Sequence, residues 1–121
     1  MRYGREKERP GPLAAPREEI GVVKLTVLYG PPQDPAAFDE HYENIHVPLA
    51  AQIPNVQRFE AGRAVGMDGG AAPYHLIAEF WFESAEQLQE SMSSPEGQAA
   101  ADDIPNFATG GATMFASEVN A

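Results

Sequence analysis

The segment YHLIAEFWFE, residues 74–83, is the clearest structural signal in the sequence. Its side chains alternate between purely apolar and mixed positions and include several aromatic residues, which predicts a β-strand with two different faces. Ser84 follows the segment and Gln87 stands three residues later, as in the capping box that opens a helix. We therefore predict a strand that leads directly into a helix.

Two more strands are predicted upstream of this segment. The first is VVKLTVLYG (22–30), whose side chains alternate in character, which is rich in β-branched residues and which ends at Gly-Pro-Pro. The second is VQRFEAGRAV (56–65), whose side chains also alternate in character. The glycine-rich stretch GMDGGAAP (66–73) reads as the loop between the second of these strands and the segment 74–83.

A helix is predicted between the first two strands. Asp34 followed by Pro35 is an N-cap with proline at the first helical position. Because proline disfavours helical geometry in the residue before it, Pro48 acts on Val47, and we expect the helix to end or kink near His46. The apolar face of this helix is expected to consist of residues at helical spacing, namely Phe38, Tyr42, Ile45 and Leu49.

The remaining sequence predicts a second helical region and a last strand. The helix opened by Ser84 runs through Leu88 and Met92, and Ser94-Pro95 restarts a helix to about Phe107. The segment ATMFASEV (112–119) has strand composition. The order βαββαβ predicts a ferredoxin-like α+β sandwich, with both helical regions on one face of an antiparallel sheet.

The two faces of this predicted sheet differ in character. The face that includes Leu25 and Phe80 is almost wholly apolar and should pack against the helices. The other face combines large apolar with polar side chains, so it needs a cover that also provides polar contacts. We expect a second copy packed sheet to sheet, with a small-molecule pocket either between sheet and helices or between the two sheets. A wet homodimer interface without ligand would also satisfy the pattern. The predicted pocket residues are Thr26, Leu28, Glu60, His75, Ile77, Trp81 and Phe115.

Composition narrows the possible functions. The chain has 121 residues, enough for one domain, and contains no cysteine, which excludes disulfides and thiolate metal sites. Residues 22–121 carry three basic and fourteen acidic side chains, so we expect no nucleic-acid partner. No apolar run is as long as a membrane span, and the N-terminus lacks the apolar stretch of a secretory signal. We therefore expect a soluble cytoplasmic protein.

Residues 1–21 form a separate region of the sequence. They are rich in charge and proline and lack hydrophobic periodicity, which predicts a flexible N-terminal extension. A start codon assigned too far upstream would explain the same composition. We accordingly divide the chain into this extension and a domain over residues 22–121.

Two motifs resemble those of a known family. FDEHYENIHVPLA (38–50) resembles the first-helix signature of the EthD family, and SPEGQAAADDIPNFA (94–108) resembles its second-helix signature. The resemblance covers about residues 23–119. It implies a ferredoxin-like protomer that pairs sheet to sheet as a dimeric α+β barrel, with a role in small-molecule metabolism. The founding member is similar to an accessory factor in the breakdown of a branched ether by a cytochrome P450 system.

The resemblance also suggests where chemistry could occur. His46 matches the family's motif histidine and lies one helical turn after Tyr42. Glu79 would be partly desolvated beside Trp81 and Phe115 on the mixed sheet face, which suits acid–base work. We predict His46, Tyr42 and Glu79 as catalytic residues of a cofactor-independent isomerase, cyclase or decarboxylase that acts on a hydrophobic or aromatic intermediate.

Several alternatives remain open at this point. His46 could simply bond free carbonyls in the last helical turn, and Glu79 could pair with Lys24 or Arg58. The protein could be a non-enzymatic accessory or ligand-binding factor of a monooxygenase system. Members are also often named EthD family reductases, but no nucleotide-binding motif is visible. No cofactor or metal is expected, although the histidines would permit haem.

Two further groups are predicted to be solvent-facing. His41 lies about 140° from His46 around an ideal α-helix, so we expect it at the surface and not beside His46. The pair Asp102-Asp103 is likewise expected on a solvated helix surface.

Overall fold

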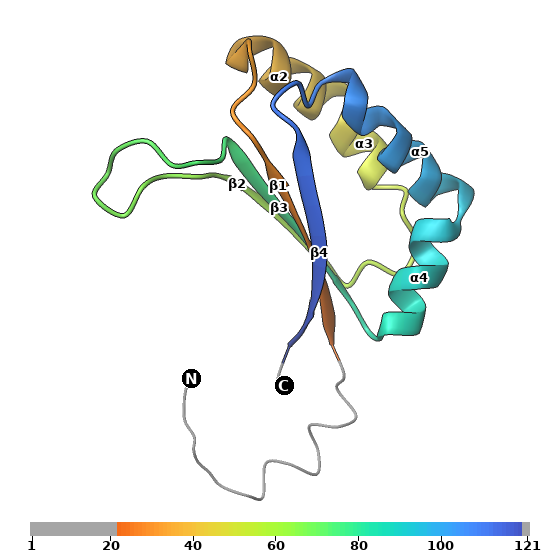
Figure 1. Ribbon diagram of the computed structural model, residues 1–121. Coiled ribbons are helices and arrows are strands. Elements are labelled where there is room, and N and C mark those ends of the chain that lie inside the picture. Colours follow the sequence, from red (N-terminus) through yellow and green to blue (C-terminus); the bar gives the residue numbers. More distant parts are fainter. Residues whose placement is uncertain (1–21, 120–121) are drawn as a thin grey trace, which may run out of the picture.

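The computed structural model describes residues 22–119, and the predicted extension 1–21 lies outside them. Its four strands form one antiparallel sheet in the order β2-β3-β1-β4. The helices all lie on one side of this sheet (Figure 1). The predicted ferredoxin-like α+β fold is therefore confirmed. The strands are β1 (Val23–Tyr29), β2 (Arg58–Arg63), β3 (Leu76–Phe82) and β4 (Ala112–Glu118).

Side-chain caps fix where the helices begin, as the sequence predicts. Asp34 accepts a hydrogen bond from the backbone N–H of Ala37, and Ser84 accepts one from that of Gln87. No helix within residues 22–119 is long and apolar enough to cross a membrane. The helical segments are α2 (Pro35–His41), the π-helical turn η2 (Tyr42–His46), α3 (Val47–Ala50), α4 (Ala85–Ser93), α5 (Pro95–Asp103) and the 3₁₀ turn η3 (Ile104–Asn106).

The first helical region does not end at His46, one of the two outcomes expected from Pro48, but passes through a π-helical turn there and continues to Ala50. Val47 has helical dihedral angles (φ −58, ψ −44), and its N–H donates to the carbonyl of Tyr42, five residues earlier. Pro48 has no N–H, and its ring would crowd the carbonyl four residues before it in a regular α-helix. The π-turn that precedes it changes the hydrogen-bonding pattern and lets the chain stay helical up to Ala50.

The π-turn also changes which residues face the core. Ile45, predicted on the apolar face, is 49% exposed, whereas His46 is only 4% exposed. A π-turn contains more residues per turn than an α-helix, so the residue after Ile45 takes the inward position. The inward residues of this region are spaced four apart, and they are Phe38, Tyr42, His46 and Ala50.

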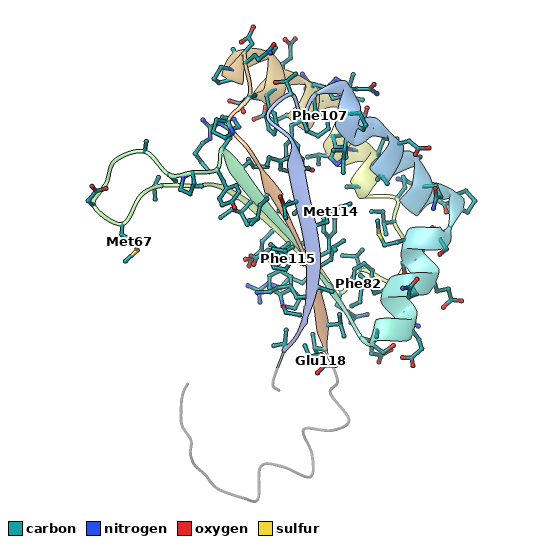
Figure 2. All side chains as sticks on the ribbon, in the orientation of Figure 1. Met67, Phe82, Phe107, Met114, Phe115 and Glu118 are labelled. Carbon is teal, nitrogen blue, oxygen red and sulfur yellow. The ribbon has the colours of Figure 1, made fainter. Side chains whose placement is uncertain are left out.

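The sheet separates a packed side from an open side. On the packed side, alternate residues of β1 and β3, such as Val27 and Phe80, form the hydrophobic core with the helices. Figure 2 shows Met114 and Phe115 on opposite sides of β4, with Met114 toward the helices. No described element covers the other side, which we call the open face (Figure 1). The open face comprises Lys24, Thr26, Leu28, Arg58, Glu60, Ile77, Glu79, Trp81, Thr113, Phe115 and Ser117.

Candidate functional site

Asp103 is the centre of a buried polar cluster between the two helical regions. It is the last residue of α5 and is 7% exposed. Its Oδ2 lies 3.0 Å from Nδ1 of His46, and its Oδ1 and Oδ2 lie 2.9 and 3.0 Å from Nε2 of His41. The amide of Asn106 donates to Oδ1 at 2.9 Å. The carboxylate is thus bound by three side chains, two of them imidazoles.

The hydrogen bond to Asp103 sets the protonation pattern of His46. A carboxylate only accepts, so Nδ1 of the imidazole is the donor and carries the proton. In the neutral ring Nε2 is then an acceptor, and no described side chain or backbone group bonds to it. Burial lowers the pKa of His46, and the opposing effect of the Asp103 carboxylate does not fully compensate. His46 is therefore held as a neutral imidazole with one free acceptor nitrogen.

The ionisation of Asp103 follows from its partners. Burial alone would raise the pKa of this carboxyl group, but the hydrogen bonds from Asn106, His41 and His46 together lower it below its usual value. Asp103 therefore stays ionised near neutral pH. An ionised carboxylate at this position orients the His46 ring and would stabilise the imidazolium that forms when Nε2 takes a proton.

Aromatic rings enclose the cluster. The Phe107 ring lies 4.8 Å from that of His46 and 5.0 Å from that of His41, measured between centroids. Tyr42 stacks on His46 at 5.5 Å. Burial raises the pKa of Tyr42 to about 12, so its phenol is neutral at physiological pH and could donate but not abstract a proton. The cluster is thus shielded from water, which strengthens its electrostatic interactions.

Two adjoining cavities lie between the helices and the sheet. His46 lines the smaller one, which has a volume of about 20 Å³ and extends toward Met114 on β4. The larger cavity, of about 370 Å³, lies between α3 and β2 and is partly open to solvent, since four of its lining residues are exposed: Ala51, Gln57, Arg58 and Phe59. Both are lined by Ala50, Ile53 and Phe80, so these three side chains form the wall between them.

Comparison with known proteins places the chain in a family. The sequence model of the EthD domain matches residues 30–111. The chain belongs to the EthD family. This match spans α2 to η3, and with them the Asp103 cluster and every lining residue of the larger cavity.

Three similar proteins illustrate the range of the family and fold. The chain is similar to an uncharacterised 11.0 kDa protein in the thcB-thcC intergenic region of Rhodococcus erythropolis. The two sequences are 48% identical over 94 residues, and the aligned region covers 78% of this chain and 91% of that protein. An ethyl tert-butyl ether D (EthD) family protein of Bacillus halodurans C-125 is 38% identical, with a TM-score of 0.76 over 80% of this chain and 97% of the other. A hydroxynitrile lyase from Passiflora edulis has a TM-score of 0.68 at 15% identity, over 84% of this chain and 95% of that one, and shares the fold alone.

The structure does not bring the three predicted catalytic residues of this EthD protein together. Tyr42 and His46 are in contact on the packed side of the sheet. Glu79 lies on the open face, where its Oε2 is 3.2 Å from Nζ of Lys24, the cross-strand pairing considered as its alternative role. The sheet stands between Glu79 and His46, so within one protomer they cannot act on the same atom.

Most of the predicted pocket residues do share one surface. Thr26 lies between Glu79 and Phe115 in the sheet, with Glu60 next to Glu79 on β2. Ile77 and Leu28 form the neighbouring row. The Trp81 ring on this face lies beneath Lys24 and Arg58, at 5.4 and 4.8 Å from its centroid. This surface is part of the open face.

His75 is placed differently from its prediction. It precedes β3, and its Nε2 bonds Oδ1 of Asp39 at 2.9 Å while its ring meets the edge of Phe38 at 4.7 Å. The strict alternation of a strand does not extend to residue 75, so the side chain turns toward α2 and not toward Glu79. Asp39 also pairs with Arg63 at 2.9 Å.

Two residues of the cluster were predicted to be solvent-facing. His41 was placed at the surface by α-helical geometry, which the π-turn overrides. Asp103 was read as part of an acidic surface pair, yet it stands three residues after Ala100 and four before Phe107, both of which are buried. That helical spacing to two buried apolar residues is a signal from which the inward position of Asp103 could have been predicted. Within residues 22–119 no group of three or more potential metal ligands is found.

Proposed function

We propose that this EthD protein catalyses cofactor-independent proton transfer on a small apolar molecule, with His46 as the acid–base group and Asp103 as its positioning residue. One observation supports this most strongly: His46 is buried, bonds Asp103 through Nδ1, and lines a cavity with its other ring nitrogen unbonded to any described group. A group that both accepts and returns protons near neutral pH is what such chemistry requires.

The proposed step balances without any electron acceptor. Nε2 of neutral His46 removes a proton from a carbon or hydroxyl of the substrate, and the electron pair of the broken bond moves into the substrate. Asp103 stabilises the resulting imidazolium through Nδ1–H. Return of the proton to a different atom of the substrate completes an isomerisation or a ring closure, and return after loss of carbon dioxide completes a decarboxylation.

The partner proposed for the open face is a second copy of the chain. Residues 22–121 carry only three cationic side chains, and two of them, Lys24 and Arg58, lie on this face. When two strongly acidic molecules associate, electrostatic repulsion is weakest between the surfaces that carry their cationic side chains. Phe115, which is 47% exposed, would be covered in such a sheet-to-sheet homodimer.

A second candidate function is ligand binding without turnover, as in an accessory factor for a catabolic system. The cavity at His46 has room for about one water molecule, since a water needs roughly 10–15 Å³ by this measure. The neighbouring 370 Å³ cavity is of ligand size but is separated from His46 by Ala50, Ile53 and Phe80. A ligand held there would not touch His46 unless that wall moves. The fold of the Passiflora hydroxynitrile lyase does not decide between the candidates, because one fold hosts many chemistries.

Hydrogen–deuterium exchange distinguishes the two candidates without knowledge of the physiological substrate. The protein is incubated in D₂O with a panel of small neutral ketones, lactones and phenolic ethers, and loss of acidic C–H signals is followed by proton NMR. We expect exchange for at least one compound with the wild type and with His75→Gln, a histidine that lines neither cavity. Equal exchange with His46→Gln would refute the acid–base role, and binding without any exchange would support the second candidate.

A further inference from the structure

We infer that the cavity between α3 and β2 is a binding site for a neutral, largely apolar molecule about the size of a substituted benzene ring. None of the pocket residues predicted from the sequence lines this cavity. As a substrate pocket it rests on the proposed function, but its selectivity for neutral ligands can be measured as binding alone.

The size of the cavity suits such a molecule. Its volume of about 370 Å³ lies in the range of small-molecule sites. An apolar cavity of about 150 Å³ is enough to hold benzene in a protein core, so this one also accommodates ring substituents. Its apolar walls are formed by Val47, Ala50, Ala51, Ile53, Val56, Phe59 and Phe80.

The charge distribution argues for a neutral ligand. Arg58 is the only charged residue among those that line the cavity, and its guanidinium is directed to the open face. There its Nε donates to Oε2 of Glu60 at 2.9 Å and its Cζ lies 4.8 Å from the Trp81 ring. An anion in the cavity would find its one potential counter-charge, Arg58, already paired with Glu60, and a cation would find no carboxylate, so neither charge would be compensated well.

One polar feature of the cavity defines the ligand further. Gln57 lines it and supplies the only neutral polar side chain of the set. A single amide can donate to one ether, carbonyl or hydroxyl oxygen, or accept from one hydroxyl. We therefore assign to the site an apolar ring or branched alkyl group that bears one oxygen function.

The position of the cavity links it to the acid–base cluster. Ala50 follows His46 by four residues on the same inward side, and it lines both cavities together with Ile53 and Phe80. The Phe80 ring in turn packs against that of Phe59 at 4.8 Å. Movement of this thin wall would admit one end of a bound ligand toward His46.

Two protein segments fit the lining of this cavity less well than a small molecule does: residues 1–21 of the chain itself and a second copy of the chain. Residues 1–21 contain nine charged side chains, for which a largely apolar cavity lined by a single charged residue is a poor match. A second copy of the chain meets the least charge repulsion at the open face, where Lys24 and Arg58 balance Glu79 and Glu60, and this face is on the other side of the sheet. Both occupants are nevertheless separable outcomes of the experiment.

Three probes of nearly equal shape test the inference by NMR titration of the full chain: benzyl alcohol, benzoate and benzylammonium. We expect benzyl alcohol to shift amide resonances of residues 47–59 and Phe80, and the two ions to bind at least about tenfold more weakly. Ala51→Phe adds a ring at an exposed lining position and should weaken benzyl alcohol binding by about tenfold or more. Ala36→Phe adds the same ring at an exposed position of α2 outside the cavity and should leave binding unchanged.

The possible outcomes separate this inference from the proposed catalysis. Equal or tighter binding of an ion, shifts confined to the open face, or no effect of Ala51→Phe would each overturn the inference. So would shifts of residues 47–59 caused by protein dilution or by removal of residues 1–21, because these would identify a protein occupant. His46→Gln should keep benzyl alcohol binding. If benzyl alcohol binds more tightly than the two ions but His46 contributes nothing to deuterium exchange, the binding site is supported and only the catalytic proposal is refuted.

Discussion

His41 and His46 bind the same carboxylate although five positions separate them in the sequence. Nε2 of His41 lies 2.9 Å from Oδ1 of Asp103, and Nδ1 of His46 lies 3.0 Å from Oδ2. On a regular α-helix the two side chains would diverge by about 140°. The π-turn Tyr42–His46 removes most of that divergence, so the cluster depends on a local irregularity of the helix.

Removing the Asp103 carboxylate should destabilise the fold. In Asp103→Ala the buried Nδ1–H of His46 loses its acceptor, which costs about 1–3 kcal/mol, and the part-buried hydrogen bonds to His41 and Asn106 are lost as well. We expect the free energy of unfolding to fall by about 2–4 kcal/mol, measured by urea denaturation with Trp81 fluorescence. The neighbouring Asp102 is exposed, so Asp102→Ala should stay within about 0.5 kcal/mol of the wild type. Similar effects of the two substitutions would contradict the central role of Asp103.

Stability should depend on pH through His46. Its pKa in the folded state is below the unfolded value of about 6.5, so the folded state binds this proton more weakly. The resulting stabilisation is complete above about pH 6.5 and is lost as the pH falls toward the lower folded pKa. We expect the difference in unfolding free energy between wild type and His46→Gln to shrink as the pH is lowered from about 7 to about 5. If this difference stays constant or grows as the pH is lowered, the pKa of His46 is not lowered in the folded protein.

The open face should mediate pairing of two chains. Phe115→Asp places a charge in the proposed interface and should convert a dimer into a monomer, as judged by light scattering after size exclusion. Ile45 has nearly the same exposure, 49% against 47%, but lies in the helical layer. Ile45→Asp should therefore leave the mass unchanged. A Phe115→Asp protein that remains dimeric would show that the chains pair through another surface.

A close contact between two backbone segments fixes the helical region that carries His46 relative to the one that carries Asp103. The N–H of Gly30 donates to the carbonyl of Gly111 at 2.9 Å, and a Cβ on Gly110 would collide with backbone atoms of Gly30 and Pro31. This contact ties the loop before α2 to the loop after η3. We expect Gly110→Ala to lower the unfolding free energy by about 1–3 kcal/mol.

Gly62→Ala is the matched control for this substitution. A Cβ at that position would meet no atom within 4 Å, and the residue has no positive φ. Such a change commonly raises the free energy of unfolding by about 0.4–1 kcal/mol, because alanine reduces the conformational entropy of the unfolded chain. Equal destabilisation by the two alanines, in the same urea measurement, would show that the Gly30–Gly110 contact carries no special constraint.

The fold could be predicted from the sequence because its signals are local. The alternation in β3 and the caps at Asp34 and Ser84 depend only on residues close in the sequence, and all three are found as predicted. The apolar face of β1 and β3 could be assigned in the same way, since strand geometry has a fixed period of two.

The candidate site could be predicted only in part. His46 could be predicted as a candidate from the sequence, but its partner Asp103 lies 57 residues away, and no local sequence pattern indicates the contact. The exposure of Ile45 and the position of His41 were wrong because a period of 3.6 was assumed through a turn that has a longer one. His75 was wrong for a similar reason, since the strand period was extended one residue beyond the strand.

The sheet that divides this molecule has a consequence for its evolution. Each residue of β1 and β3 belongs either to the helix side or to the open face, never to both. After a gene duplication, substitutions at positions such as Leu28 or Ile77 could therefore change which chains assemble, while the environment of His46 stays as it was. Changes at Phe59 or Ala51 could alter ligand choice and leave assembly untouched. A lineage built on this architecture can diverge in partner and in chemistry by independent steps.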